Sequence, residues 1–172
     1  MLTIDPRLHQ SRTKVRPEWI DRNNHVNASY YLAIVKEPAI ELHERWDYGQ
    51  DFVDRTGESN FVINAEVVYL REMLLGDEVT VVSRLVDLDD KRIRILFEIV
   101  NTTRRYLAAL VQYHVIHVRL GPPPKAVSIP PDLRQRLQTQ LDLSRSIPLP
   151  VEVNRFKSFQ RAQAVPESSM VG

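Results

Sequence analysis

The sequence predicts an α+β fold, with one long helix packed against a five-stranded antiparallel sheet. Apolar residues recur every three or four positions between residues 28 and 46, which is typical of an amphipathic helix. In four later segments they alternate with polar residues, which is typical of strands, and short turn-like sequences join those segments. Strands that follow a helix and are joined by short turns favour an α+β layer.

The chain before the helix is expected to contribute one strand. Residues 1–12 are expected to form an irregular lead-in. The sequence TKVRPEWI, residues 13–20, is predicted to form the first strand. Pro17 cannot donate a hydrogen bond to a neighbouring strand, so this strand is expected at an edge of the sheet or with a bulge.

The long helix is predicted over residues 28–46, where Asn27 or Ser29 can cap its start and Gly49 suits its end. Pro38 lies inside the periodic pattern. A proline there lacks the N–H that the helix needs, and its ring clashes with the preceding turn. We therefore expect the helix to kink, or to be divided after a short first piece.

Four strands are predicted after the helix, over residues 60–70, 77–86, 91–100 and 105–120. The last of them is apolar on both faces, which predicts a central position in the sheet. A proline-rich segment then ends the sheet, and a short helix is predicted over residues 130–141. We expect residues 1–141 to form a single domain and residues 142–172 to form a C-terminal extension that is partly disordered.

The predicted sheet has more surface than one helix can cover. Its second face and its two edge strands would remain uncovered, and an uncovered edge favours pairing with another chain. The sequence therefore predicts a homodimer, or a homotetramer made of two dimers.

The composition narrows the class of protein. The 23 basic and 22 acidic residues give a net charge of +1, so no nucleic-acid partner is expected. The apolar runs are too short to span a bilayer and the first residues lack the apolar core of a signal peptide, so a cytoplasmic location is expected. The chain has no cysteine, which excludes disulfides, thiolate metal sites and cysteine nucleophiles.

No metal site is predicted. His114 and His117 are three residues apart on an expected strand, so their side chains should point to opposite faces and cannot easily share a metal ion. The aspartates of residues 87–90 lack the glycine and the spacing of a calcium-binding loop, and we interpret them as a hairpin turn.

The stretch WIDRNNHVNASYY, residues 19–31, concentrates polar chemistry directly before the helix. Two explanations are open from spacing alone. In the first, Asp21 and Asn27 only form turns and caps, and His25 is packed and hydrogen-bonded. In the second, these side chains surround a reacting group.

This stretch resembles the opening motif of the 4-hydroxybenzoyl-CoA thioesterase-like group of acyl-CoA thioesterases, which have the hot-dog fold. The matching residues are Asp21, His25, Val26, Asn27, Tyr31 and Leu32. Glu37 matches a glutamate often found further along the helix of that family, and the resemblance extends from about residue 15 to residue 120. Asn24 replaces the usual glycine and Ala28 replaces a second asparagine. Asparagine tolerates the left-handed backbone conformation, so we expect the loop shape to persist.

The resemblance implies hydrolysis of an acyl-CoA thioester without a metal or bound cofactor, coenzyme A being part of the substrate. Asp21 is then the general base or the nucleophile, and the helix macrodipole is expected to favour its ionised form. Backbone N–H groups of residues 27–29 would polarise the carbonyl, with His25 orienting it. Asn24 and Asn27 are expected to fix the loop. Glu37 either approaches the pocket or is a solvated helix residue.

The acyl group and the contacts to coenzyme A stay open at this stage. The candidates for lining the acyl pocket are Tyr30, Tyr31, Trp46, Phe61 and Tyr69, although each is equally explained as core. Aromatic rings suit an aryl group, a short branched chain or a cationic head. The candidates for the phosphates of coenzyme A are Arg71, Arg84, Lys91, Arg92 and Arg94, of which Lys91 and Arg92 are the preferred pair; a solvated sheet face explains them as well.

Two other functions compete with thioester hydrolysis. A hot-dog hydratase or dehydratase also uses an aspartate and a histidine, but with a longer separation than that of Asp21 and His25. A non-catalytic protein that binds acyl-CoA or an acyl carrier would use the same pocket. A serine hydrolase is disfavoured because no GxSxG sequence is present.

Overall fold

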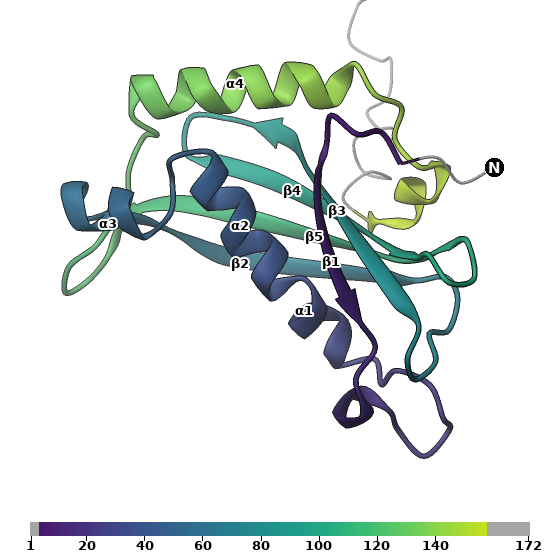
Figure 1. The fold of residues 1–172 in the computed structure, drawn as a ribbon. Helices are drawn as coiled ribbons and strands as arrows, with labels where there is room; N and C mark the ends of the chain where they lie inside the picture. The colour runs from purple at the N-terminus through teal and green to yellow at the C-terminus, as the bar shows by residue number, and fades with distance from the viewer. Residues whose placement is uncertain (1–3, 158–172) are drawn as a thin grey trace, which may run out of the picture.

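A computed structural model describes residues 4–157 (Figure 1). The strands are β1 His9–Lys14, β2 Glu58–Tyr69, β3 Glu78–Leu88, β4 Arg92–Asn101, β5 Tyr106–Arg119 and β6 Lys125–Ala126. The α-helices are α1 Tyr30–Ile34, α2 Lys36–Arg45, α3 Gln50–Thr56 and α4 Pro131–Arg145. Two short 3₁₀ helices are η1 Pro17–Trp19 and η2 Val151–Arg155. Within this part of the chain, no helix is long and apolar enough to cross a membrane.

The five long strands form one antiparallel sheet in the order β1-β3-β4-β5-β2, and the two-residue strand β6 pairs with β5. Helices α1 and α2 cross one face of this sheet (Figure 1). The α+β prediction is therefore confirmed. So is the central position of β5, which lies between β4 and β2. The edges of the path are β1 and β2.

The first strand lies earlier than predicted. The structure forms β1 from His9–Lys14, inside the expected lead-in, and residues 17–19 form η1 instead of a strand. Within residues 4–157, strand β1 pairs with β3 alone, and its sequence HQSRTK contains no apolar residue. Such an edge strand gives no hydrophobic alternation for a sequence-based prediction to detect.

The long helix is divided, as the position of Pro38 predicts. Val35 ends α1 and begins α2, and the N–H of Ala39 bonds to the carbonyl oxygen of Val35 at 2.9 Å. Pro38 therefore lies in the first turn of α2, where a missing N–H costs nothing. Two short helices result, and α1 contains only five residues.

A β-bulge in β2 changes which side chains share a face. The register with β5 shifts between Val62 and Asn64. Phe61 pairs with Ile116, whereas Asn64 pairs with His114. Because the extra residue reverses the alternation, Phe61 does not share the helix-covered face with the end of β2 as strict alternation predicts.

The main core lies between the sheet and the helices. Helix α4, at the top of Figure 1, contributes Leu133, Leu137 and Leu141 to this core. The core also includes Leu42 of α2 and Trp46, which follows α2. Helix α4 reaches Arg145, four residues beyond the end predicted for it.

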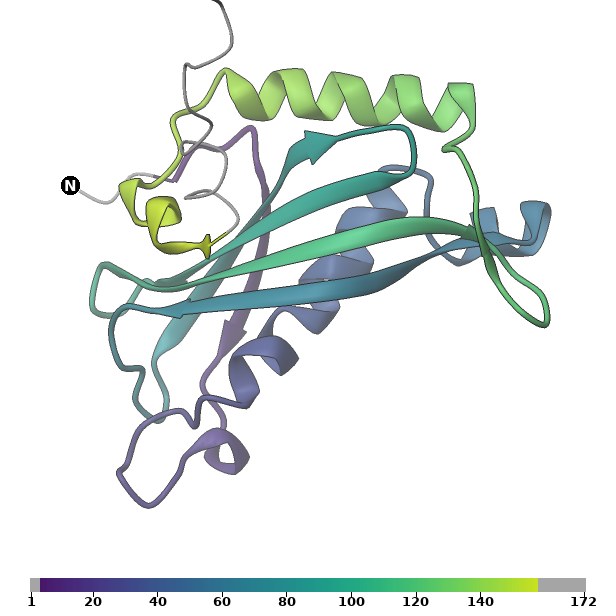
Figure 2. The same cartoon turned by 180° about the vertical axis from the view of Figure 1, so that it is seen from behind.

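The second face of the sheet is partly covered by the chain itself. After α4, residues 146–157 pass behind the sheet, the side seen in Figure 2. Val153 and Phe156 are buried there against Leu96 and Leu110. The packing of this extension was not predicted from the sequence, and its residues 158–172, on which the predicted partial disorder also falls, lie outside the described residues.

Candidate functional site

The polar loop between η1 and α1 is held in a defined shape. An isolated bridge joins Ile20 and Val26, and the N–H of Asn24 bonds to the carbonyl oxygen of Asp21 at 3.0 Å. Asn24 has a φ angle of 61°, the left-handed conformation that the sequence predicts for the position of the family's glycine. The N–H of Val26 bonds to Met73 at 2.9 Å, which fixes the loop against the β2–β3 connection.

Asp21 is half-buried in this loop. Its Oδ1 accepts the N–H of Asn23 at 2.8 Å, a local turn bond. Helix α1 begins only at Tyr30, so the carboxylate does not stand at a helix start, as the dipole argument required. Among the described residues no partner is recorded for Asp21 Oδ2, and this oxygen is open to a water molecule or a substrate.

The amides of residues 27–29 are not equally available. Asn27 donates its N–H to Trp19 at 2.8 Å, and Ser29 donates its N–H to the side chain of Asn27 at 3.0 Å. The N–H of the exposed Ala28 has no recorded bond within residues 4–157. The carbonyl oxygens of Asn27 and Ala28 both accept hydrogen bonds. That of Asn27 accepts the N–H of Tyr30 at 3.0 Å, and that of Ala28 accepts the hydroxyl of Tyr69 at 3.0 Å. The loop therefore presents one fixed N–H, that of Ala28.

His25 does not contact the Asp21 side chain in any recorded bond. Its Nε2 lies 3.2 Å from a carboxylate oxygen of Glu72, which belongs to the β2–β3 connection. The carbonyl oxygen of Glu72 accepts the hydroxyl of Tyr106 at 2.6 Å. Glu72 was missed from the sequence, because a glutamate in a connection between strands does not by itself suggest a site, whereas the N–H of Ala28 is one of the three predicted for residues 27–29.

Aromatic rings gather on both sides of the loop. Tyr31 and Tyr69 meet edge to face with ring centres 5.0 Å apart, and Trp19 and Tyr30 lie 6.4 Å apart. Burial, with Tyr69 and Glu72 nearby, raises the pKa of Tyr31 to about 12, so the phenol is protonated at neutral pH. Trp46 is a buried core residue, and its carbonyl oxygen accepts a hydrogen bond from Arg136 of α4.

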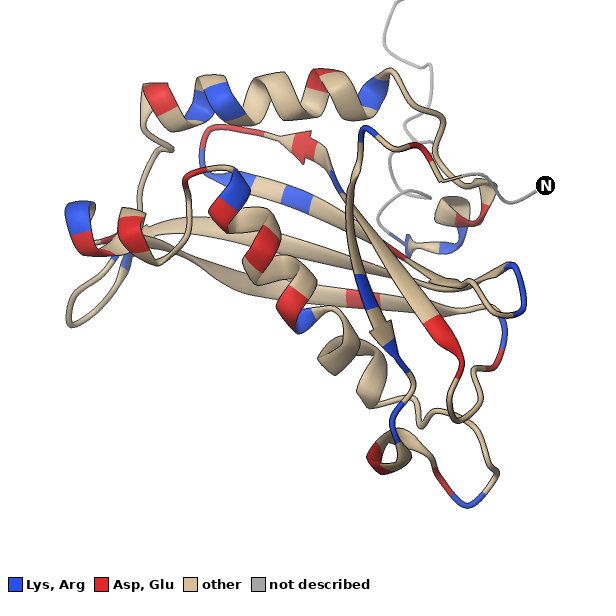
Figure 3. Cartoon of the chain, viewed as in Figure 1, with Lys and Arg blue, Asp and Glu red and all other residues tan. Residues whose placement is uncertain are grey.

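Other predicted site residues lie elsewhere in the chain. Glu37 is exposed beside Lys36 at 3.9 Å, on a groove between β1 and the helices. Phe61 is exposed on edge strand β2. Strand β3 is eleven residues long, begins next to the loop and ends at the hairpin that holds Lys91 and Arg92, so this pair lies at the end of β3 that is remote from the loop (Figure 1 and Figure 3).

Two further predictions about charged residues are corrected. Arg84 is buried under the extension, where it pairs with Glu98, and cannot reach a phosphate in solvent. A second expectation is that Glu41 pairs with Arg45 four residues later on the helix, and no bond between these two side chains is found among the described residues. Glu41 instead bonds to Ser11 and, at 3.1 Å, to His9, which ties α2 to β1.

The two strand histidines face opposite sides, as predicted. His117 is buried among the helices, where its ring nitrogens lie 2.7 Å from the Tyr48 hydroxyl and 3.0 Å from Glu58. His114 lies on the second face, and burial, with Arg94 nearby, lowers its pKa. Within residues 4–157, no three side chains are grouped as metal ligands would be.

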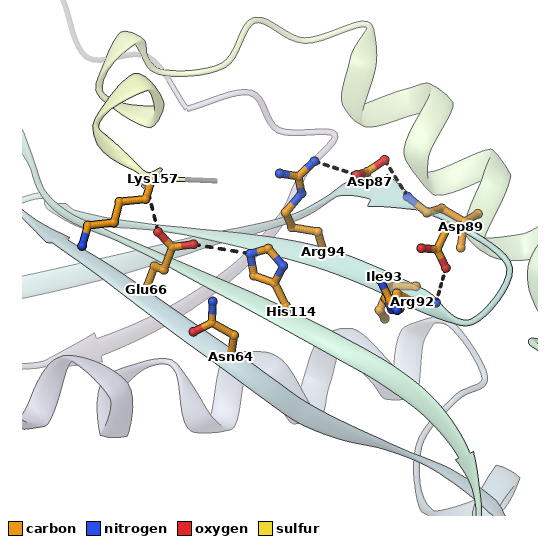
Figure 4. Close-up of a pocket in the computed structure, with 10 residues that line it drawn as sticks. Asn64, Glu66, Asp87, Asp89, Arg92, Ile93, Arg94, His114 and Lys157 are labelled. Carbon is orange, nitrogen blue, oxygen red and sulfur yellow. Dashed lines mark hydrogen bonds and ion pairs between the residues drawn. The ribbon is translucent and has the colours of Figure 1, made fainter. Parts of the chain in front are cut away.

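A hollow of about 630 Å³ lies on the uncovered part of the second face (Figure 4). Its charged groups are mostly matched within the chain. Arg94 bonds to Asp87 at 2.6 Å, and Glu66 lies 3.5 Å from His114 while accepting the N–H of Lys157. The hollow is therefore lined by side chains of both charges, some of them paired with one another.

Known proteins resemble this chain over most of its length. The family described as the thioesterase-like superfamily matches residues 15–137. A betainyl-CoA thioesterase of Pseudomonas aeruginosa is 26% identical over 143 residues, which make up 83% of this chain and 89% of that protein. An L-carnitine dehydrogenase/betainyl-CoA thioesterase of Agrobacterium fabrum is 28% identical over 144 residues, 84% of this chain but only 28% of that longer protein.

Solved structures of other proteins have a similar fold. The structure of a hypothetical protein of Staphylococcus aureus in complex with CoA gives a TM-score of 0.78 at 18% identity. The match covers 89% of this chain and 96% of that one. This likeness confirms the predicted hot-dog architecture, an antiparallel sheet curled around a helix.

Proposed function

The chain belongs to the thioesterase-like superfamily, and from that premise we propose that it hydrolyses an acyl-CoA thioester at the loop of Asp21. The observation that carries the proposal is the pairing of two groups in one loop. Asp21 has an open carboxylate oxygen, and Ala28 has an open and fixed N–H. Thioester hydrolysis needs a base or nucleophile together with a donor for the developing oxyanion.

The reaction follows from these two groups. The Asp21 carboxylate takes a proton from water while the hydroxide oxygen adds to the thioester carbonyl carbon. The carbonyl oxygen becomes an oxyanion and accepts the N–H of Ala28. The carbon–sulfur bond then breaks, and the thiolate of CoA leaves and is protonated. Direct attack by Asp21, with a mixed anhydride that water then hydrolyses, uses the same geometry.

We further propose that two copies pair through β2. This strand is twelve residues long and lies at an edge of the sheet. Phe61, Val62 and Ile63 are consecutive and each more than 40% exposed, an arrangement that a monomer would leave prone to aggregation. Antiparallel pairing of two β2 strands would place the Phe61 end of one copy beside the Tyr69 end of the other. The extension covers much of the second face, which weakens the case for a tetramer.

The acyl group we propose is short and cationic. Two relatives are named for betainyl-CoA, whose acyl group is an acetyl that carries a trimethylammonium. The tyrosines at the loop agree with this class, because aromatic rings attract quaternary ammonium groups. Aryl and branched acyl groups remain the comparison substrates.

A non-catalytic acyl-CoA-binding protein is the second candidate. The observation that favours it is the turn bond of Asp21, which a purely structural aspartate would also make. Asp21→Asn separates the two functions, because its amide oxygen can still accept the N–H of Asn23.

The test measures release of free CoA from short, branched, aromatic, cationic and long-chain acyl-CoAs. We expect Asp21→Asn to lower kcat about 100-fold or more while CoA binding stays within a few-fold. Asp51→Asn, an exposed aspartate of α3, is the matched control and should keep full activity. Equal turnover by wild type and Asp21→Asn would remove Asp21 from the mechanism. Binding without turnover of any substrate would favour the non-catalytic protein.

A further inference from the structure

Tyr69 occupies a distinctive position at the end of β2. Its hydroxyl donates to the carbonyl oxygen of Ala28 at 3.0 Å, the same residue whose N–H is open. Its side chain is 47% exposed, although it stands beside the candidate site. A tyrosine held by its hydroxyl and left open at its ring offers a fixed aromatic surface to a bound acyl group.

The neighbours of Tyr69 favour a positive ligand. Tyr31 meets its ring edge to face at 5.0 Å and is itself 4% exposed, so Tyr69 is the ring that a ligand would touch. Glu72 lies in the connection that follows β2. It is exposed, and its carboxylate stands next to His25. The third tyrosine nearby, Tyr106, already has the guanidinium of Arg71 over its ring at 5.1 Å. The chain itself thus uses an aromatic ring of this cluster to hold a cation.

We infer that Tyr69, backed by Tyr31 and assisted by Glu72, holds the positively charged head of the acyl group and thereby selects the substrate. The inference rests on the proposed thioesterase function and adds the residues that determine its specificity. Tyr69 is not assigned a part in bond breaking.

The geometry suits a short acyl group in particular. In a trimethylammonioacetyl thioester, one methylene separates the nitrogen from the carbonyl carbon. If the carbonyl oxygen accepts the N–H of Ala28, the ammonium must lie within a few ångströms of that residue. The hydroxyl of Tyr69 ties its ring to the same residue, and cation–π attraction acts over roughly 6 Å from a ring centre. In a long acyl chain with a distant cation, the cation would lie beyond the reach of this ring.

The sharpest probe compares two acyl groups of the same shape. Trimethylammonioacetyl-CoA carries the charge, and 3,3-dimethylbutanoyl-CoA replaces the nitrogen by carbon and is neutral. The measured quantity is the ratio of kcat/KM for the cationic substrate to that for the neutral one. A general loss of folding or catalysis lowers both values and leaves the ratio unchanged.

Two substitutions at Tyr69 separate the ring from the hydroxyl. Tyr69→Leu removes the ring, and we expect the ratio to fall about 3- to 30-fold, the range of one cation–π contact. Tyr69→Phe keeps the ring and removes the bond to Ala28, so both substrates can lose rate while the ratio is retained. Glu72→Gln is expected to lower the ratio a few-fold through lost charge.

Each outcome decides the inference. A wild-type preference for the cationic substrate that is lost in Tyr69→Leu and kept in Tyr69→Phe supports it. A wild-type protein that hydrolyses the neutral isostere equally well overturns it and leaves the thioesterase function intact. An unchanged ratio in Tyr69→Leu also overturns it. If the wild type hydrolyses no acyl-CoA at all, the proposed function fails first, and the inference fails with it.

Discussion

The ion pair between Arg84 and Glu98 provides a direct stability test of how the C-terminal extension is anchored. Both side chains lie on the second face, and that of Arg84 is only 3% exposed. Arg84 donates to Glu98 at 2.9 Å and to the carbonyl oxygens of Ile147 and Pro148 at 3.1 and 3.2 Å. The pair therefore connects β3 and β4 to the first residues after α4.

The perturbation is Glu98→Gln, which keeps the shape and removes the charge. An arginine cannot release its proton, so the buried guanidinium would lose the carboxylate that it bonds to. Breaking a buried pair in this way costs about 3–5 kcal/mol. Arg84 keeps its two carbonyl partners, and we therefore expect the lower end, about 3 kcal/mol, or a Tm lowered by about 6–12 °C for a chain of this size.

The assay is urea unfolding at neutral pH, with a double-mutant cycle. Arg84→Met combined with Glu98→Gln should cost less than the sum of the two single substitutions, because neither charge is then left alone. Glu152→Gln is the matched control, since this glutamate lies near Glu98 but bonds to no recorded partner, and it should change stability by less than about 0.5 kcal/mol. A cost below about 1 kcal/mol for Glu98→Gln, or additive costs in the cycle, would refute the reasoning.

Two shorter predictions follow from single residues. Asn24 has a φ of 61°, so Asn24→Val should lower the free energy of unfolding by about 1–2 kcal/mol while Asn24→Gly leaves it nearly unchanged; equal urea stabilities for the two variants would contradict this. Although burial alone would raise the pKa of Asp77, bonds from the Leu74 N–H, Asn101 and Arg104 outweigh it and hold that pKa below its usual value. The stability due to the Asp77 charge is thus present above about pH 4 and is lost as the pH falls further. The difference in Tm between wild type and Asp77→Asn should therefore shrink from pH 7 to pH 3. A difference that stays constant over this range would argue against the role of the charge.

Features that depend on backbone chemistry could be predicted from the sequence. Pro38 divides the helix because its ring and its missing N–H act locally, whatever the fold around them. Asn24 takes the left-handed conformation for a similarly local reason. The opposite orientations of His114 and His117 follow from the alternation of a strand without bulges between them.

Features that depend on distant contacts could not be predicted. Strand β1 has no apolar residue and is defined only by its pairing with β3. The bulge in β2 is one residue that no composition rule marks, yet it moves Phe61 away from the face of Tyr69. Val153 and Phe156 are two apolar residues in a polar segment, and only the bare second face of the sheet explains why they are buried.

The candidate site also combines residues placed by local bonds with residues placed by distant contacts, and this difference indicates which of them determine its specificity. The motif residues Asp21 and Asn27 are close in sequence and build the loop through local bonds. Tyr69, the last residue of β2, and Glu72 of the β2–β3 connection reach the loop from more than forty residues later in the chain, through one hydroxyl and one ion pair. Substitutions in the loop alter the reaction itself, whereas substitutions at these two later positions can change the acyl group without disturbing the loop. Members of one family can therefore share the motif and differ in substrate, and Tyr69 is the position in this chain where that difference should be measurable.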